Sequence, residues 1–253
     1  MKELGTLRVI WNWGIRQGHL AAPVPFMDRD LDFARTEEKP PFRTFDEIKQ
    51  VVEWGGLGDD EVAALWECLY LRLEEVHEVL GVVKERASAH RIYPMFALVA
   101  MTGMRRSEMA ASRREDINFK SAVISVREKK RVKGVNSFRP IDIDPFLASV
   151  MTDWFAVHPG GPYTICQRVN EPLSVDQATD HFKRTLAGTK WEVIGGFHTF
   201  RHSFASNLAA AGVDEPTIDA WMGHQTEEQR KRYRHLFPQD RKRSIDLLSP
   251  KKD

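Results

Sequence analysis

The sequence predicts a mainly α-helical protein with one small antiparallel β-sheet, an α+β fold, and two patterns support this class. From residue 44 onward, apolar residues recur at helical spacing over most of the chain. Strand-like residues are confined to two short runs, 117–126 and 138–143, which flank a stretch rich in lysine and arginine. Because Gly134 and Asn136 within that stretch favour a turn, we expect a basic β-hairpin.

The first predicted element is an amphipathic helix over residues 4–19, which Gly18, Pro23 and Pro25 end. Residues 21–42 contain four prolines and charges of both signs, which is typical of a linker. A lone helix of this length cannot bury its own apolar face. We therefore expect three parts, with 1–22 as the end of one domain, 23–42 as a linker and 43–253 as the principal domain.

The principal domain is expected to consist largely of helices. Thr44 and Glu47 form a capping box that opens the first of them. Glycines near residue 56 end that helix, and one long helix follows over about 59–83, a stretch whose role the sequence does not assign. Further helices are expected at about 89–101, 107–111, 145–157, 174–187, 198–211, 214–222 and 227–236.

Composition excludes several classes of protein. The 253 residues are 42% hydrophobic and 29% charged, which is ordinary for a globular protein, and no apolar run approaches the roughly 18 residues that span a bilayer. Cys68 and Cys166 are far apart and lack a CxxC spacing, so we expect neither a disulfide framework nor a zinc site. We expect a cytoplasmic protein with no membrane partner.

The net charge of +1 hides an uneven distribution. Residues 44–80 contain ten acidic and two basic residues, whereas 105–139 contain eleven lysines or arginines and four acids. Residues 225–243 contain seven basic residues and three acids. One such run alone is typical of a solvated helix face. Two basic blocks around the motifs described next indicate an electrostatic footprint for a polyanion.

Two arginines stand in positions suited to a phosphate. Arg105 follows a Thr-Gly helix break at the start of a short helix, where backbone N–H groups also point outward. His198 and Arg201 are three residues apart and share one helix face, so both can reach one phosphate group. His198 and His202 also have the spacing of a zinc pair, but Thr199 stands where metalloprotease chemistry needs glutamate. We therefore expect no metal ion, and an ordinary packing role for His202.

Tyr233 lies in the most basic local sequence of the four tyrosines, between Arg230 and His235. A tyrosine has a pKa near 10 and is a poor nucleophile. Positive neighbours favour the phenolate, so this placement predicts a lowered pKa for Tyr233. His224 follows a glycine nine residues before the tyrosine.

In their order along the chain, these motifs resemble those of the tyrosine recombinases, the family of phage integrases and Xer-like proteins. That family shows TGxR, a basic β-hairpin, HxxR, GH and then a tyrosine. The resemblance covers roughly residues 42–248, and residues 1–20 resemble the last helix of the DNA-gripping core-binding domain. The pattern here reads Thr102-Gly-Met-Arg105, Lys129/Lys130/Lys133, His198-Thr-Phe-Arg201, Gly223-His224 and Tyr233.

The resemblance implies a tyrosine recombinase catalytic-domain fold and a chemical role for each motif. Arg105 and Arg201 stabilise the phosphate in the transition state. Tyr233 attacks phosphorus and leaves a 3′-phosphotyrosyl bond and a free 5′-hydroxyl group. Glu108 steadies the surroundings of the first arginine. This chemistry needs no cofactor, and the sequence shows neither a phosphate-binding P-loop nor a carboxylate cluster for two metal ions.

The resemblance assigns the remaining roles to two histidines and a lysine. His198 and His224 hydrogen-bond the phosphate oxygens or assist proton transfer. A hairpin lysine protonates the leaving 5′-oxygen, and this hairpin is longer than is usual in the family. The choice stays open among Lys129, Lys130 and Lys133. The register of the first strand favours Lys130, which we select, whereas counting back from the second strand favours Lys133.

Double-stranded DNA at att-like sites is the implied partner, with a homotetramer in the synaptic complex and a monomer for the chain alone. The implied activity is site-specific recombination or integration. Two other functions remain open, namely DNA relaxation of the type IB topoisomerase kind and a catalytically silent DNA-binding accessory protein. One departure from the family is Arg230, which stands in place of the usual threonine and should affect packing or phosphate contacts.

Overall fold

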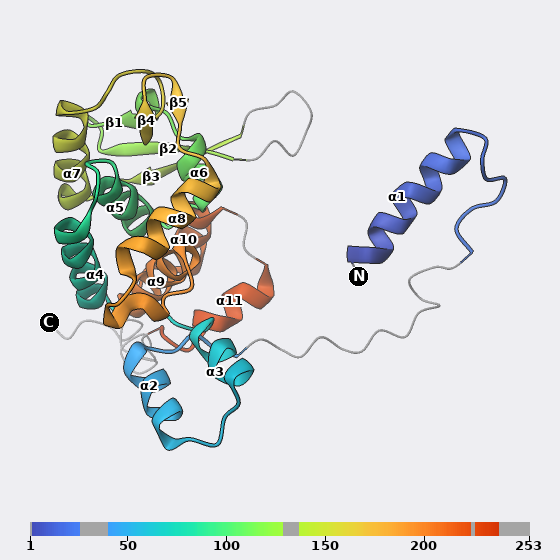
Figure 1. Ribbon diagram of the computed structural model, residues 1–253, viewed down its shortest axis with the longest axis horizontal. Coiled ribbons are helices and arrows are strands. Elements are labelled where there is room, and N and C mark those ends of the chain that lie inside the picture. The colour runs from blue at the N-terminus through green and yellow to red at the C-terminus, as the bar shows by residue number, and fades with distance from the viewer. Residues whose placement is uncertain (1, 26–39, 129–136, 224–225, 238–253) are drawn as a thin grey trace, which may run out of the picture. The chain divides into compact units, whose positions relative to one another are not determined.

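The computed structural model describes residues 2–25, 40–128, 137–223 and 226–237 (Figure 1). The chain divides into two units, Met1–Glu38 and Lys39–Asp253. The first unit contains α1 (Lys2–Arg16), which is the predicted N-terminal helix. Four of its large apolar side chains are exposed, namely Leu7, Val9, Ile10 and Trp13.

The second unit is mostly helical and contains two small antiparallel sheets, which confirms the predicted fold class (Figure 1). Its α-helices are α2 (Phe45–Trp54), α3 (Asp59–Trp66), α4 (Leu73–Arg86), α5 (Ile92–Thr102), α6 (Arg106–Ala111), α7 (Pro145–Ala156), α8 (Val175–Leu186), α9 (Phe197–Ala210), α10 (Glu215–Met222) and α11 (Glu227–Arg234). Two short 3₁₀ helices are η2 (Arg114–Asp116) and η3 (Lys190–Val193). In the part that the structure describes, no helix is long and apolar enough to cross a membrane.

The predicted strands form a three-stranded sheet in the order β1-β2-β3, and a second pair was not predicted. The strands are β1 (Ile117–Asn118), β2 (Val123–Arg127), β3 (Phe138–Asp142), β4 (Cys166–Arg168) and β5 (Glu171–Pro172). Val126 pairs with Arg139 in the β2–β3 ladder. Burial alternates along β3, so that Arg139 and Ile141 face inward. The unpredicted β4–β5 pair is only a few residues long and too short to show alternation.

The prediction of one long helix over 59–83 is wrong. The chain leaves α3 after Trp66 and runs as a buried extended segment before α4 begins. Two backbone bonds hold this segment, because Arg43 N donates to Cys68 O at 2.9 Å and Tyr70 N donates to Arg43 O at 2.9 Å. Pairing with a distant strand-like segment therefore overrides the local helical pattern.

Helix α5 forms the centre of the core because it is apolar on all sides. Nine of its 11 residues are buried, and it contacts α4, α7 and α9. Phe96 on α5 stacks on Phe182 of α8, with ring centroids 5.0 Å apart. It also meets Phe197 and Phe200 of α9 at centroid distances of 5.4 and 6.0 Å. These ring contacts fix α9, which presents the residues of the candidate site.

Replacement of Gly103 by alanine is expected to lower the free energy of unfolding by about 2–4 kcal/mol, from left-handed backbone strain together with overpacking. Gly103 ends α5 with φ of 59°, and an added Cβ would lie 2.6 Å from Cδ1 of Phe204. Urea unfolding of the variant measures the loss.

Gly81→Ala is the matched control, because Gly81 lies within α4 and an added Cβ would meet no atom within 4 Å. This variant should be more stable than the wild type by roughly 1 kcal/mol, since alanine favours the helix. Equal stability of Gly103→Ala and the wild type would show that the turn does not need glycine.

Candidate active site

Arg105 lies at the N-cap position of α6, directly after the left-handed turn at Gly103. Glu108 in the first turn of α6 accepts from the Arg105 backbone N–H and from Nη1, both at 2.8 Å. The second terminal nitrogen, Nη2, donates to the carbonyl of Gly223 at 3.3 Å. The Arg105 side chain is 38% exposed. Arg105 is thus held by its own helix but remains accessible to a ligand.

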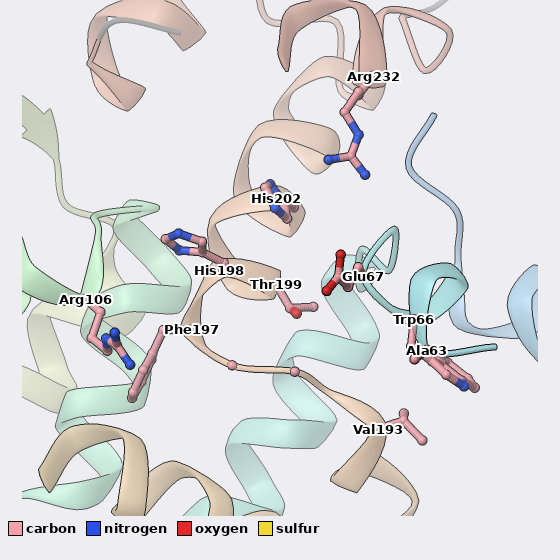
Figure 2. Close-up of a pocket in the computed structure, with 12 residues that line it drawn as sticks. Ala63, Trp66, Glu67, Arg106, Val193, Phe197, His198, Thr199, His202 and Arg232 are labelled. Atoms are coloured by element: carbon pink, nitrogen blue, oxygen red, sulfur yellow. The ribbon is translucent and has the colours of Figure 1, made fainter. Parts of the chain in front are cut away.

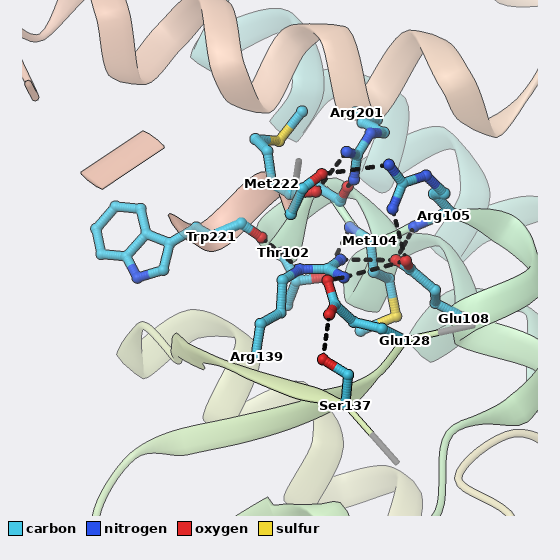
Figure 3. A network of polar contacts seen from close by, with 12 residues as sticks. Thr102, Met104, Arg105, Glu108, Glu128, Ser137, Arg139, Arg201, Trp221 and Met222 are labelled. Carbon is cyan, nitrogen blue, oxygen red and sulfur yellow. Dashed lines mark hydrogen bonds and ion pairs between the residues drawn. The ribbon is translucent and has the colours of Figure 1, made fainter. Parts of the chain in front are cut away.

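Arg201 lies on α9 and is 7% exposed. Its Nη1 donates to Gly103 O at 2.6 Å and its Nη2 donates to Met222 O at 2.5 Å (Figure 3). Burial, with a further contribution from the positive charge of Arg105, lowers the pKa of Arg201 to about 9. The guanidinium therefore stays charged at neutral pH. Arg201 and Arg105 both donate hydrogen bonds to carbonyl groups at the C-terminal end of α10.

A third arginine, Arg139 of β3, belongs to the same network, and the sequence analysis did not assign it. Its Nη1 and Nη2 donate to the two carboxylate oxygens of Glu108 at 3.0 and 2.6 Å, and its Nε donates to Trp221 O at 2.7 Å (Figure 3). Burial alone would raise the pKa of Glu108, but the hydrogen bonds from Arg139 and Arg105 outweigh it and the pKa is lowered. The sequence did offer one signal for Arg139: in the alternating pattern of residues 138–142, the arginine occupies a position that faces inward.

His198 is exposed on α9 at a cavity of about 730 Å³ (Figure 2). Protein atoms exclude water from part of the His198 ring, which disfavours the charged imidazolium and lowers its pKa. The positive charges of Arg201, Arg106 and Arg105 lower it further. The imidazole is therefore neutral at pH 7 and able to accept a proton. The cavity is lined by residues of α3, α6, α9 and α11 and of the loop before α9, including Trp66, Glu67, Arg106, Gly196, His202 and Arg232.

His202 is half-buried one turn after His198, and its ring lies 4.3 Å from that of Phe42. This ring contact agrees with the packing role expected for His202. The two histidine rings are 6.2 Å apart. Among the described residues, no group of three or more histidine, cysteine, aspartate or glutamate side chains could hold a metal ion.

Tyr233 of α11 is 1% exposed and lies in an apolar cluster with residues of α9 and α10. Within the described part of the chain, its hydroxyl has no hydrogen-bond partner. Burial raises the pKa of Tyr233 strongly, and the carboxylates of Asp219 and Glu215 raise it further. The expectation of a lowered pKa is therefore wrong.

Burial is the main reason, and in addition the neighbouring arginines are paired with carboxylates. Arg230 Nε donates to Asp219 Oδ2 at 2.6 Å. Arg234 Nη2 donates to Glu215 Oε1 at 3.0 Å, and its Nη1 to Glu227 at 2.6 Å. The pairs with Asp219 and Glu215 join α11 to α10, so Arg230 contributes to local packing, one of the two effects expected for it.

Comparison with known proteins adds the family. Residues 70–240, more than half of the chain, match the family model described as the phage integrase family. The chain belongs to the phage integrase family. Among the curated relatives, the tyrosine recombinase XerA of Thermococcus onnurineus is 25% identical over 164 residues, 61% of this chain and 53% of the relative. The type 1 fimbriae regulatory protein FimB of Escherichia coli is 27% identical over 163 residues, 61% of this chain and 78% of the relative.

The fold of this family member resembles those of solved recombinases. A crystal structure of XerA recombinase covers 82% of this chain and 82% of its own, with a TM-score of 0.55 and 15% identity. The Tn1549 transposon integrase in complex with transposon right end DNA covers 96% of this chain and 77% of its own, with a TM-score of 0.59 and 16% identity. The chain spans about half the length of the first curated relatives it matches.

Two of the motifs predicted for this integrase-family chain lie outside the described residues. They are the hairpin lysines, Lys129, Lys130 and Lys133, and His224. The residues that flank the hairpin are described. Glu128 N donates to Ser137 O at 2.9 Å, and Ser137 Oγ donates to Glu128 Oε2 at 2.6 Å.

Proposed function

We propose that this chain is the catalytic part of a site-specific DNA recombinase that cleaves and rejoins DNA strands through Tyr233. The observation that carries the proposal is the meeting of Arg105 and Arg201 at the end of α10, with His198 nearby on α9. Two curated relatives are named tyrosine recombinases. We interpret residues 1–22 as the end of a core-binding domain and 23–42 as a linker.

The charges at this site favour an anion. Burial lowers the pKa of Arg201, and the positive charge of nearby Arg105 lowers it further. A phosphate between them would relieve this repulsion, and it would do so more strongly as charge accumulates in the transition state. Glu108 is already shared by Arg105 and Arg139, so it leaves the Arg201 charge available to a ligand.

The proposed reaction is an in-line displacement at phosphorus. The Tyr233 hydroxyl forms a bond to phosphorus while its proton passes to a base, a role for which the neutral imidazole of His198 is suited. The bond from phosphorus to the 5′-oxygen breaks, and a hairpin lysine supplies the proton to that oxygen; Lys130 is our choice over Lys129 and Lys133. His224 hydrogen-bonds a phosphate oxygen. The phosphotyrosyl ester conserves the bond energy, so rejoining needs no cofactor.

The buried hydroxyl of Tyr233 implies that α11 moves before the reaction. A nucleophile that is 1% exposed cannot reach a DNA phosphate. The ion pairs of Arg230 with Asp219 and of Arg234 with Glu215 hold α11 against α10 in this arrangement. We propose that binding of double-stranded DNA at an att-like site, with assembly from monomers into a homotetrameric synapse, releases these contacts.

Asp219→Asn is expected to increase the rate of covalent adduct formation about two- to fivefold, because a partly exposed ion pair contributes up to about 1 kcal/mol. The substitution removes the main partner of Arg230 and also a charge that raises the pKa of Tyr233. Glu228→Gln, an equal change of charge in the exposed first turn of α11, is the matched control. A rate unchanged or reduced by Asp219→Asn alone would contradict the proposed release of α11.

A trapping assay tests the proposed function. The probe is a pool of nicked DNA duplexes that carry randomised inverted repeats, so that cleavage releases a short strand and prevents rejoining. We expect a protein–DNA species that survives denaturation by detergent. DNA binding without any such species would instead support the accessory-protein function, and relaxation of a plasmid that lacks the selected site would support the topoisomerase function.

A further inference from the structure

Three consecutive carbonyl groups at the end of α10 each accept a hydrogen bond from a different arginine (Figure 3). The carbonyl of Trp221 accepts from Arg139 Nε at 2.7 Å. Those of Met222 and Gly223 accept from Arg201 at 2.5 Å and from Arg105 at 3.3 Å. The last carbonyls of a helix lack partners within the helix and carry its negative partial charge. The end of α10 therefore has a fixed position relative to all three arginines.

Arg139 is as buried as Arg201, but all three nitrogens of its guanidinium already hydrogen-bond to protein groups among the described residues. Its side chain is 6% exposed, whereas that of Arg105 is 38% exposed. Within the described residues, every hydrogen bond of its guanidinium goes to Glu108 or Trp221. The hydrogen bonds of Arg139 therefore connect it to the phosphate site through these two groups.

Glu108 joins Arg139 directly to Arg105. One of its oxygens, Oε1, accepts from Arg105 Nη1 at 2.8 Å and from Arg139 Nη1 at 3.0 Å. The other oxygen accepts from Arg139 Nη2 at 2.6 Å and from the Arg105 backbone N–H at 2.8 Å. Because Arg139 donates to both oxygens of Glu108, it fixes the orientation of the carboxylate. The carboxylate in turn orients the Arg105 guanidinium.

Packing at Gly223 ties the same arginine to the end of α10. A Cβ added at Gly223 would lie 3.1 Å from Cδ and from Nη1 of Arg139. The chain at Gly223 leads from α10 to α11, which carries Tyr233. Arg139 thus contacts Glu108, which holds Arg105, and the backbone at the end of α10, which leads to the helix that carries Tyr233.

We infer that Arg139 is a positioning residue that sets the Arg105–Glu108 pair and the end of α10 for the reacting phosphate. This inference rests on the proposed function. A competing role passes through Glu128, whose Oε1 lies 3.6 Å from Arg139 Nη1 at the base of the basic hairpin. In that case Arg139 would act on the general acid and not on the phosphate site.

Two trapping substrates, one with oxygen and one with sulfur at the 5′-bridging position, separate a role at the phosphate site from a role in general-acid catalysis. The rate of single-turnover cleavage is measured on each. A thiolate leaves without protonation because the pKa of a thiol is far below that of an alcohol, so sulfur removes the need for a general acid. We expect Arg139→Met to slow cleavage about 10²-fold on both substrates, as a small displacement of a catalytic group does. The DNA affinity should stay within about twofold of the wild type.

Arg139→Lys and Glu128→Gln complete the experiment. Lysine keeps the charge but cannot bridge both oxygens of Glu108 and Trp221 O, so it should recover only part of the rate and provides the test if Arg139→Met fails to fold. Glu128→Gln, which removes the carboxylate charge that faces Arg139 at the base of the hairpin, should cleave the sulfur substrate like the wild type. Wild-type cleavage by both Arg139 variants, or sulfur restoring their rates to that of the wild type, would overturn the inference.

Failure of the proposed function has a separate signature. If the wild-type chain forms no adduct, hydrogen exchange of the amide groups at 219–223 still tests the contact network. We expect at least fivefold faster exchange there in Arg139→Lys than in Glu128→Gln. Equal exchange in the two variants would overturn the positioning role.

Discussion

Tyr233→Phe is expected to abolish the covalent adduct with DNA, leave DNA binding intact and raise the free energy of unfolding by about 1 kcal/mol. The first effect follows because phenylalanine has no oxygen to attack phosphorus. The stability effect follows because the Tyr233 hydroxyl is buried without a hydrogen-bond partner among the described residues. A buried hydroxyl that lowers stability is expected at a functional position, because it is retained for its chemistry and not for folding.

The pH dependence of unfolding provides a second signature of this tyrosine. Its folded pKa is raised above the usual value of 10.0, so the unfolded chain loses this proton first as pH rises. The contribution of the neutral phenol to stability is therefore complete below pH 10 and is lost above it. Tyr233→Phe should flatten this alkaline loss.

The matched controls are Tyr70→Phe, Tyr93→Phe and Tyr163→Phe, the other three tyrosines of the chain. Each should retain the adduct. Gel analysis of trapped adducts and urea unfolding across pH measure the two effects. An adduct formed by Tyr233→Phe, or a clear loss of stability in this variant, would contradict the account.

Arg201→Lys is expected to reduce the cleavage rate about 10³-fold, the larger end of the effect of removing one transition-state donor. The Arg201 guanidinium uses two nitrogens to hold Gly103 O and Met222 O. A lysine ammonium is a single point charge and cannot span both carbonyls and a phosphate. The same substitution should also weaken folding, since one buried carbonyl loses its partner.

Arg184→Lys on the exposed surface of α8 is the control for the chemical change itself. It should cleave at the wild-type rate. Single-turnover rates at saturating protein separate the loss of chemistry from a loss of DNA affinity. A rate for Arg201→Lys within about tenfold of the wild type would show that the arginine fork is not required.

Local sequence patterns predicted the helices that have clear ends. Helices α7, α8, α10 and α11 each begin with a side-chain cap from Asp144, Ser174, Asp214 or Thr226, and they match their predicted ranges within two residues. The segment between α3 and α4 was not predictable in this way. Its extended backbone depends on pairing with Arg43, a contact that no local window contains.

The candidate site shows the same division between local and distant information. The motifs pointed to Arg105 and Arg201, which both donate to the end of α10, and to His198, whose pKa both arginines lower. The pKa of Tyr233 was mispredicted because the local sequence shows neither the burial of the side chain nor the carboxylates of Asp219 and Glu215, which are near it only in space. Arg139 was missed because its importance comes from its contact with Glu108 across 31 positions of the chain.

The most direct test of the central claim is the identification of the residue that carries DNA. Trapped adducts would be digested with protease and nuclease, and mass spectrometry would locate the residual nucleotide. The account predicts a nucleotide 3′-phosphate on Tyr233, within the segment of α11. A nucleotide on Tyr70, Tyr93 or Tyr163, or on a serine, would contradict the assignment of Tyr233 as the nucleophile.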